Sequence, residues 1–151
     1  STFSRRFSKK MNIPLTLMDE IMWNPGWQYI GDEPVIKKLD KISQAETWII
    51  EGYITTRART FLFDRADTVI YLDYSPWVST FRYLLRCIKH WKKPRPELPG
   101  SPDIFNLNFL KLVWTKGESI SLNKFLQEVS DQSKIIIFKK PKEAKAFLLQ
   151  Y

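Results

Sequence analysis

Hydrophobic positions along the chain alternate between short continuous runs and stretches with helical spacing. The short runs are rich in β-branched and aromatic residues and predict strands over 13–18, 47–51, 68–72 and 134–138. Apolar residues three or four positions apart predict helices over 1–10, 35–45, 55–65 and 77–91, and further helices from about 105 and from 141. Strands that alternate with helices favour an α/β fold with a parallel sheet covered by helices on both faces.

Two segments interrupt this alternation. Residues 23–27 read Trp-Asn-Pro-Gly-Trp and predict a loop. Residues 94–102 contain four prolines and one glycine, and the missing N–H of proline excludes them from a helix or a sheet interior. We expect the second segment to form an exposed flap.

The helix predicted over 77–91 has two distinct stripes. Its apolar positions 77, 81, 84, 88 and 91 step by four and three, which places them on one face. Basic residues step in the same way along another face, at Arg82, Arg86, Lys89 and Lys93. Residues 76–96 contain six basic and no acidic residues, so most of the net charge of +8 lies in this short segment. Such a local positive field attracts polyanions, either nucleotide phosphates or nucleic acid.

Length and composition narrow the class of protein. The 151 residues have the length of one globular domain, 1–151, and a single cysteine excludes a disulfide framework. No apolar run approaches the roughly 18 residues of a membrane span, and no signal-peptide pattern follows the first residues. We therefore expect a soluble cytoplasmic protein with no membrane partner.

Three acidic residues follow predicted strands: Asp19, Glu51 and Asp73. Ligands of parallel α/β folds bind beyond the carboxyl ends of the strands, where such acids can organise a metal ion and an acceptor hydroxyl. The alternative is that they only solubilise loops or cap helices. Arg82 and Arg86 share a helix face and can clamp phosphate oxygens through their guanidinium groups; the alternative for them is a solvated basic face.

The order of several blocks resembles the FlaR-type "DNA topology modulation" proteins, which are P-loop proteins similar to adenylate kinase. The specific block is Asp19 followed by Trp-Asn-Pro-Gly-Trp at 23–27. The other blocks are residues 12–14, 48–53, 65–73 and 93–96. The resemblance covers essentially the whole chain.

The resemblance implies a P-loop kinase-like parallel sheet of order 2-3-1-4-5, with residues 92–103 as a small lid. It implies that Ser1 and Thr2 are the end of a Walker A motif, with the Ser1 hydroxyl on Mg²⁺ and Thr2 against a phosphate. Glu51 would orient a Mg²⁺-bound water, Arg82 would stack near the base, and Arg86 would hold phosphate oxygens. Tyr-Ile-Thr follows Gly52 where adenylate kinases have Phe-Pro-Arg, which argues against AMP as the acceptor.

The resulting hypothesis is an ATP-dependent phosphotransferase that uses Mg²⁺ and acts on a small acceptor, with Asp19 accepting a hydroxyl proton. The alternatives are a nucleic-acid-binding protein that uses residues 76–96, and a relic that binds nucleotide without catalysis. The resemblance also implies that the central strand and the Walker A loop precede Ser1. We therefore expect the strands over 47–51 and 68–73 not to pair directly.

Overall fold

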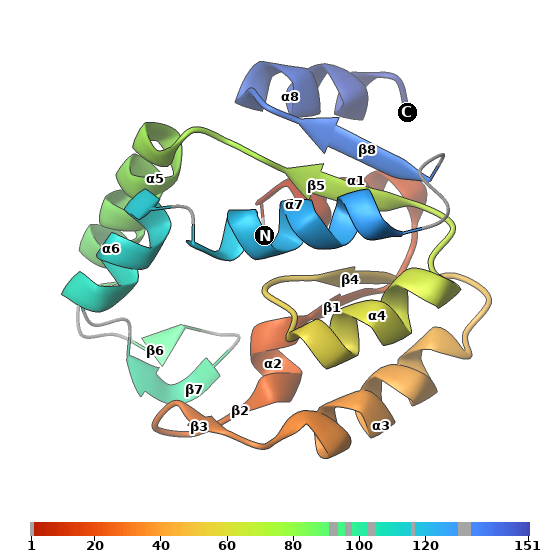
Figure 1. Cartoon of the computed structure of the whole chain (residues 1–151), viewed down its shortest axis with the longest axis horizontal. Coiled ribbons are helices and arrows are strands. Elements are labelled where there is room, and N and C mark those ends of the chain that lie inside the picture. The colour runs from red at the N-terminus through yellow and green to blue at the C-terminus, as the bar shows by residue number, and fades with distance from the viewer. Residues whose placement is uncertain (1, 91–93, 96–97, 103–104, 116, 130–133) are drawn as a thin grey trace. The chain divides into compact units, whose positions relative to one another are not determined.

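A computed structural model describes residues 2–90, 94–95, 98–102, 105–115, 117–129 and 134–151 (Figure 1). Helices alternate with short parallel strands, which confirms the α/β class. Contacts divide the chain into two compact units. The first unit contains Ser1–Ala66, Pro94–Pro102 and Lys145–Tyr151, and the second contains Asp67–Lys93 and Asp103–Ala144.

Most elements of the first unit come from the N-terminal half of the chain. Its helices are α1 (Thr2–Met11), α2 (Met18–Met22), α3 (Asp32–Ser43) and α4 (Thr56–Arg65). Its strands are β1 (Leu15–Leu17), β2 (Trp23–Asn24), β3 (Gln28–Tyr29), β4 (Ile49–Glu51), β6 (Pro94–Arg95) and β7 (Leu98–Pro102). The predicted helices and strands are therefore present, with ends that differ by a few residues.

The second unit contains two strands and three complete helices. Its strands are β5 (Val69–Leu72) and β8 (Ile135–Phe138), and its helices are α5 (Pro76–Lys89), α6 (Leu107–Thr115) and α7 (Gly117–Glu128). The last helix, α8 (Pro141–Leu149), begins in this unit and ends in the first one. None of the described helices is long and apolar enough to cross a membrane.

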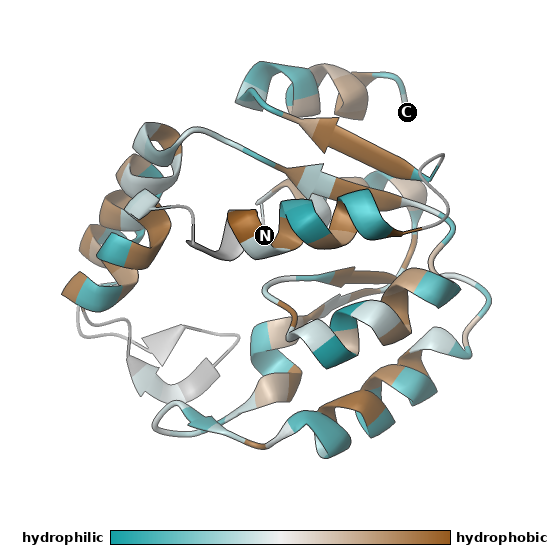
Figure 2. Ribbon diagram, in the orientation of Figure 1, coloured by the Kyte–Doolittle hydropathy of each residue, from teal (hydrophilic) through white to brown (hydrophobic). Residues whose placement is uncertain are grey.

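Two of the four two-stranded sheets in the described part of the chain are parallel. β1 pairs with β4, with Leu17 opposite Glu51, and β5 pairs with β8, with Leu72 opposite Phe138. β4 and β5 belong to different sheets, as expected from the sequence. We predicted strands buried on both faces, but β4 and β5 are only half-buried. Each strand has one hydrogen-bonded neighbour among the described strands. Figure 2 shows that both strands are largely hydrophobic despite this partial burial.

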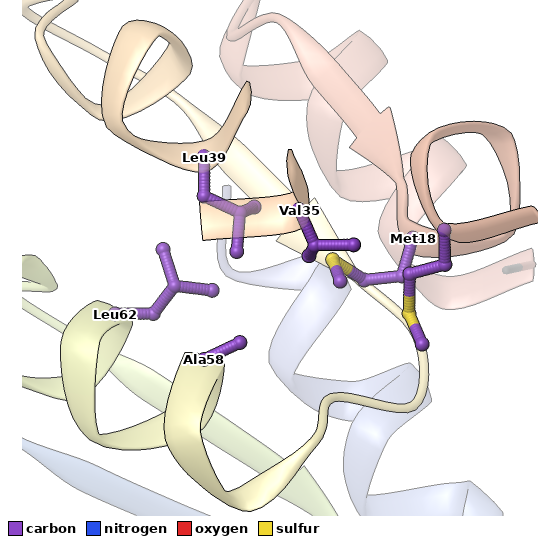
Figure 3. Packing of buried hydrophobic residues seen from close by; sticks show 6 residues of the cluster. Met18, Val35, Leu39, Ala58 and Leu62 are labelled. Carbon is purple, nitrogen blue, oxygen red and sulfur yellow. The ribbon is translucent and has the colours of Figure 1, made fainter. Parts of the chain in front are cut away.

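The core of the first unit is built from pairs of side chains four positions apart on three helices (Figure 3). This spacing places both members of a pair on the same helix face. Burial of each large aliphatic side chain contributes about 1.5–3 kcal/mol. The residues are Met18 and Met22 of α2, Val35 and Leu39 of α3, and Ala58 and Leu62 of α4.

Local sequence explains where two of the helices begin. At α5, Ser75 is the N-cap, its Oγ accepts a hydrogen bond from the Val78 N–H (3.4 Å), and Pro76 occupies the first turn. At α8, the Glu143 carboxylate accepts from the N–H groups of Lys139 (2.9 Å) and Lys140 (3.0 Å). The Ser75 side chain satisfies an N–H group in the first turn of α5, and the Glu143 side chain satisfies the N–H groups of the two residues before α8.

Candidate functional site

Asp19 and Glu51 lie at the same edge of the β1–β4 pair. Glu51 is the last residue of β4 and stands opposite Leu17, the last residue of β1. Asp19 follows two residues later, in the first turn of α2, where the sequence predicted a loop. Both carboxylates are half-buried. The parallel register thus brings together two of the acids that were predicted to converge.

A close backbone approach fixes this edge. Gly52 follows Glu51 and has φ of +135°, a conformation that other residues rarely adopt. A Cβ on Gly52 would lie 2.9 Å from the Cβ of Met18 and 3.5 Å from its backbone nitrogen. Glycine is therefore required for the end of β4 to lie against the start of α2, beside Asp19.

An aromatic cluster follows Asp19 along the chain. The segment predicted as a loop at 23–27 is instead part of a β2–β3 hairpin, in which Asn24 pairs with Gln28. The Trp23 ring centroid lies 5.9 Å from that of Trp27 and 5.6 Å from that of Tyr29, and both contacts are edge-to-face. The hairpin thus holds three aromatic rings together, and those of Trp27 and Tyr29 are exposed.

The flap predicted at 94–102 is an antiparallel hairpin, and it was wrong to expect all of it to be exposed. Ser101 is completely buried. Its Oγ accepts hydrogen bonds from the N–H groups of Gly26 (2.9 Å) and Trp27 (3.3 Å). The β6–β7 hairpin is therefore tied to the turn of the aromatic hairpin. Residues 92–93, 96–97 and 103 of the predicted lid lie outside the described residues.

Sequence reasoning missed a hydrogen-bonded group beside this cluster. The Tyr29 hydroxyl donates to Asp32 Oδ1 (2.5 Å), and the Thr55 hydroxyl donates to the same oxygen (2.9 Å). The bonds from Tyr29 and Thr55 lower the pKa of the Asp32 carboxyl. Burial, followed by the bond to Asp32, raises the pKa of the Tyr29 hydroxyl.

The predicted site residues Asp73, Arg82 and Arg86 belong to the second unit. Asp73 follows β5 and accepts a hydrogen bond from the Tyr71 hydroxyl (3.4 Å). Arg82 is exposed, with its guanidinium carbon 4.7 Å from the centroid of the Tyr74 ring. Arg86 is half-buried, 5.4 Å from the Tyr83 centroid and 6.0 Å from that of Phe109. The two arginines therefore have different environments. Their spacing on one basic helix face did not predict this difference.

The residues available for a magnesium ion are few. Thr2 is exposed at the start of α1, and Ser1 lies outside the described residues. Within the described ranges, no group of three or more His, Cys, Asp or Glu residues lies close enough to hold a metal ion. Magnesium that is bound with nucleotide phosphates commonly takes one or two protein carboxylates, and Glu51 supplies one at the end of β4.

The arrangement combines acids at the carboxyl edge of a parallel pair with an aromatic hairpin that follows the first acid. This arrangement suits a ligand with hydroxyl groups. Carboxylates accept hydrogen bonds from hydroxyl groups, and aromatic rings contact a ligand through their faces. Comparisons with protein-family models, curated proteins and solved structures found no match for this chain.

Proposed function

We propose that this protein is a nucleotide-binding P-loop phosphotransferase that transfers the γ-phosphoryl group of ATP to a small acceptor. The strand pairing carries the proposal, because β1 pairs with β4 and β5 pairs with β8, both in parallel. These would be the two outer pairs of a sheet of order 2-3-1-4-5, in which the central strand leads into the phosphate-binding loop.

The acceptor side is assigned to the first unit. The acceptor binds over Asp19 and the aromatic cluster of Trp23, Trp27 and Tyr29, in which the Trp23 ring contacts the other two rings at centroid distances of 5.9 Å and 5.6 Å. The Asp19 carboxylate accepts the proton of the attacking hydroxyl as the new oxygen–phosphorus bond forms. The bond between the γ-phosphorus and the bridging oxygen breaks, and ADP leaves.

For the donor side, the sequence resemblance assigns Glu51 to magnesium and the α5 arginines to the nucleotide. Magnesium bound with ATP neutralises phosphate charge, and Ser1 and Glu51 are its proposed protein ligands. Arg82 is exposed and holds its guanidinium on the Tyr74 ring, so it is available to the nucleotide base or phosphates. Arg86 packs on Tyr83 and Phe109, which restricts its rotamers, and its proposed role is to hold phosphate oxygens.

Acceptor-stimulated ATP turnover tests the proposal. We expect full-length protein to consume ATP faster with one member of a panel of nucleosides, sugars and small hydroxy acids. Asp19→Asn should lower that turnover about 10²- to 10⁴-fold with little change in ATP affinity, because general-base catalysis contributes about that much. Asp64→Asn, at an exposed position of α4, is the matched control.

Two results would contradict this assignment. ATP binding without turnover for any acceptor indicates a nucleotide-binding relic. Loss of ATP binding in Asp19→Asn, with the control unaffected, moves Asp19 to the donor side.

One observation favours nucleic-acid binding as a second candidate. Arg82 and Lys89 are exposed on α5, within a segment that has six basic and no acidic residues over 76–96. Phosphate contacts from such residues make affinity fall steeply with salt. In a fluorescence anisotropy titration, Lys89→Ala should reduce the salt slope by about 1 and weaken all DNA sequences equally. Failure to bind DNA at low salt eliminates this candidate.

A further inference from the structure

Helix α5 exposes the apolar stripe that the sequence pattern would bury. The stripe consists of Trp77, Phe81, Leu84 and Ile88. Trp77 is 72% exposed, Phe81 64% and Ile88 73%. Isolated exposed apolar residues are common on protein surfaces, but a continuous row along one helix face marks an interaction site.

Contacts with α6 set the direction in which this stripe points. About 100° around α5 from the stripe lie Tyr83 and Cys87, which are buried. The Tyr83 hydroxyl accepts a hydrogen bond from the Asn106 N–H (2.9 Å) just before α6 begins, and its ring centroid lies 5.0 Å from that of Phe109. Rotating α5 about its axis to bury the stripe would break these contacts, so the stripe remains available to a partner.

The spacing of the stripe suits another helix. Its positions step by four, three and four residues, which is the spacing of the seam in a two-stranded coiled coil. Beside the seam, Val78 and Leu85 are also apolar. The charged neighbours Arg82 and Lys89 each follow a stripe residue by one position, about 100° around the helix. The seam itself therefore carries no charge.

We propose that the stripe of α5 is a self-association surface, on which a second copy of this chain packs its own α5 in antiparallel orientation about a two-fold axis. A two-fold interface brings the same patch of both copies together, so the patch must be self-complementary. An apolar seam meets this requirement. A seam containing Arg82 and Lys89 would oppose like charges.

The area available is sufficient for a small interface. From the exposed fractions of the stripe and Leu85, each copy offers on the order of 500 Å², given that large aromatic side chains bury about 150–250 Å² each. The two copies together would bury about 1,000 Å², which is the lower limit for a specific interface. We therefore expect a reversible dimer.

Light scattering on size-exclusion fractions of the full-length natural protein, over about 1–100 µM, tests this proposal. The expected result is a mass that rises from monomer to dimer. The double variant Phe81→Ser/Ile88→Ser should remain monomeric, with the dissociation constant raised at least tenfold. Lys89→Ser, next to Ile88 but off the seam, is the matched control and should still dimerise. Circular dichroism checks that each variant keeps its helix content.

Salt distinguishes this partner from an anionic one. Higher salt should leave the dimer unchanged or strengthen it, because it screens the repulsion between the basic residues of the two copies. Three outcomes overturn the proposal: a monomer at 100 µM, a dimer that survives the double variant, and a monomer that binds anionic phosphatidylglycerol vesicles through the stripe, which would assign the stripe to a membrane surface.

Discussion

Replacing Ser101 by alanine removes one hydroxyl that accepts two backbone hydrogen bonds. The N–H groups of Gly26 and Trp27 both donate to Ser101 Oγ, at 2.9 Å and 3.3 Å, and Ser101 is fully buried. Alanine fits the space but offers no acceptor. The substitution therefore leaves two donors at the aromatic hairpin without their partner, while β6 and β7 keep their backbone pairing.

The expected cost follows from the energy of such bonds. A typical intramolecular hydrogen bond contributes about 0.5–1.5 kcal/mol net. The two bonds together therefore contribute about 1–3 kcal/mol, and the Trp27 bond, which is the longer one, contributes less than the Gly26 bond. Since about 1.4 kcal/mol corresponds to a factor of ten, the opening equilibrium of the turn should rise roughly 5- to 150-fold.

Amide hydrogen exchange measures this effect at the residues concerned. A local measurement suits a chain with two compact units, because one global transition need not report on a single turn. We expect faster exchange at Gly26 and Trp27 in Ser101→Ala. Ser121→Ala, at an exposed position of α7, is the control and should leave their exchange unchanged. Unaltered protection of both amides in Ser101→Ala would refute the proposed tie between the hairpins.

Two further predictions concern the same unit. Gly26 and Gly100 both have φ of +80°, but a Cβ on Gly26 meets nothing within 4 Å, whereas a Cβ on Gly100 lies 3.1 Å from the Pro25 Cβ. Chemical denaturation should therefore show that Gly100→Ala lowers the free energy of unfolding more than Gly26→Ala does. Equal losses would contradict this contact. The lowered pKa of Asp32 stabilises the fold above the ordinary carboxyl pKa and this contribution disappears as pH falls through the lowered value. Asp32→Asn should remove this pH dependence and lower the pKa of Tyr29 in an NMR titration.

The arginines of α5 show how tertiary packing changes an expectation. From their spacing, Arg82 and Arg86 share one basic face. Arg82 is indeed exposed, but Arg86 is half-buried on Tyr83 and Phe109. Phe109 belongs to α6, so no periodicity within α5 could have predicted this contact. A substitution of Arg86 would therefore alter packing as well as charge.

The sequence alone determined the α/β class and most element positions, because these depend on neighbouring residues. β-branched runs predicted β4, β5 and β8 to within two residues, and Ser75-Pro76 accounts for the start of α5. Acids at strand ends also followed from the sequence, and the parallel register then placed Asp19 and Glu51 at one edge. Such features require only local propensity and the direction of the strands.

Tertiary structure alone decided which surfaces are buried. Ser101 is buried through bonds to residues 74 and 75 positions earlier, a separation at which local pattern carries no information. The 4-3 spacing on α5 is visible in the sequence, but α6 packs on Tyr83 and Trp77 and leaves most of that stripe exposed. Periodicity defines the faces of a helix, whereas the element that packs against the helix determines which face is buried.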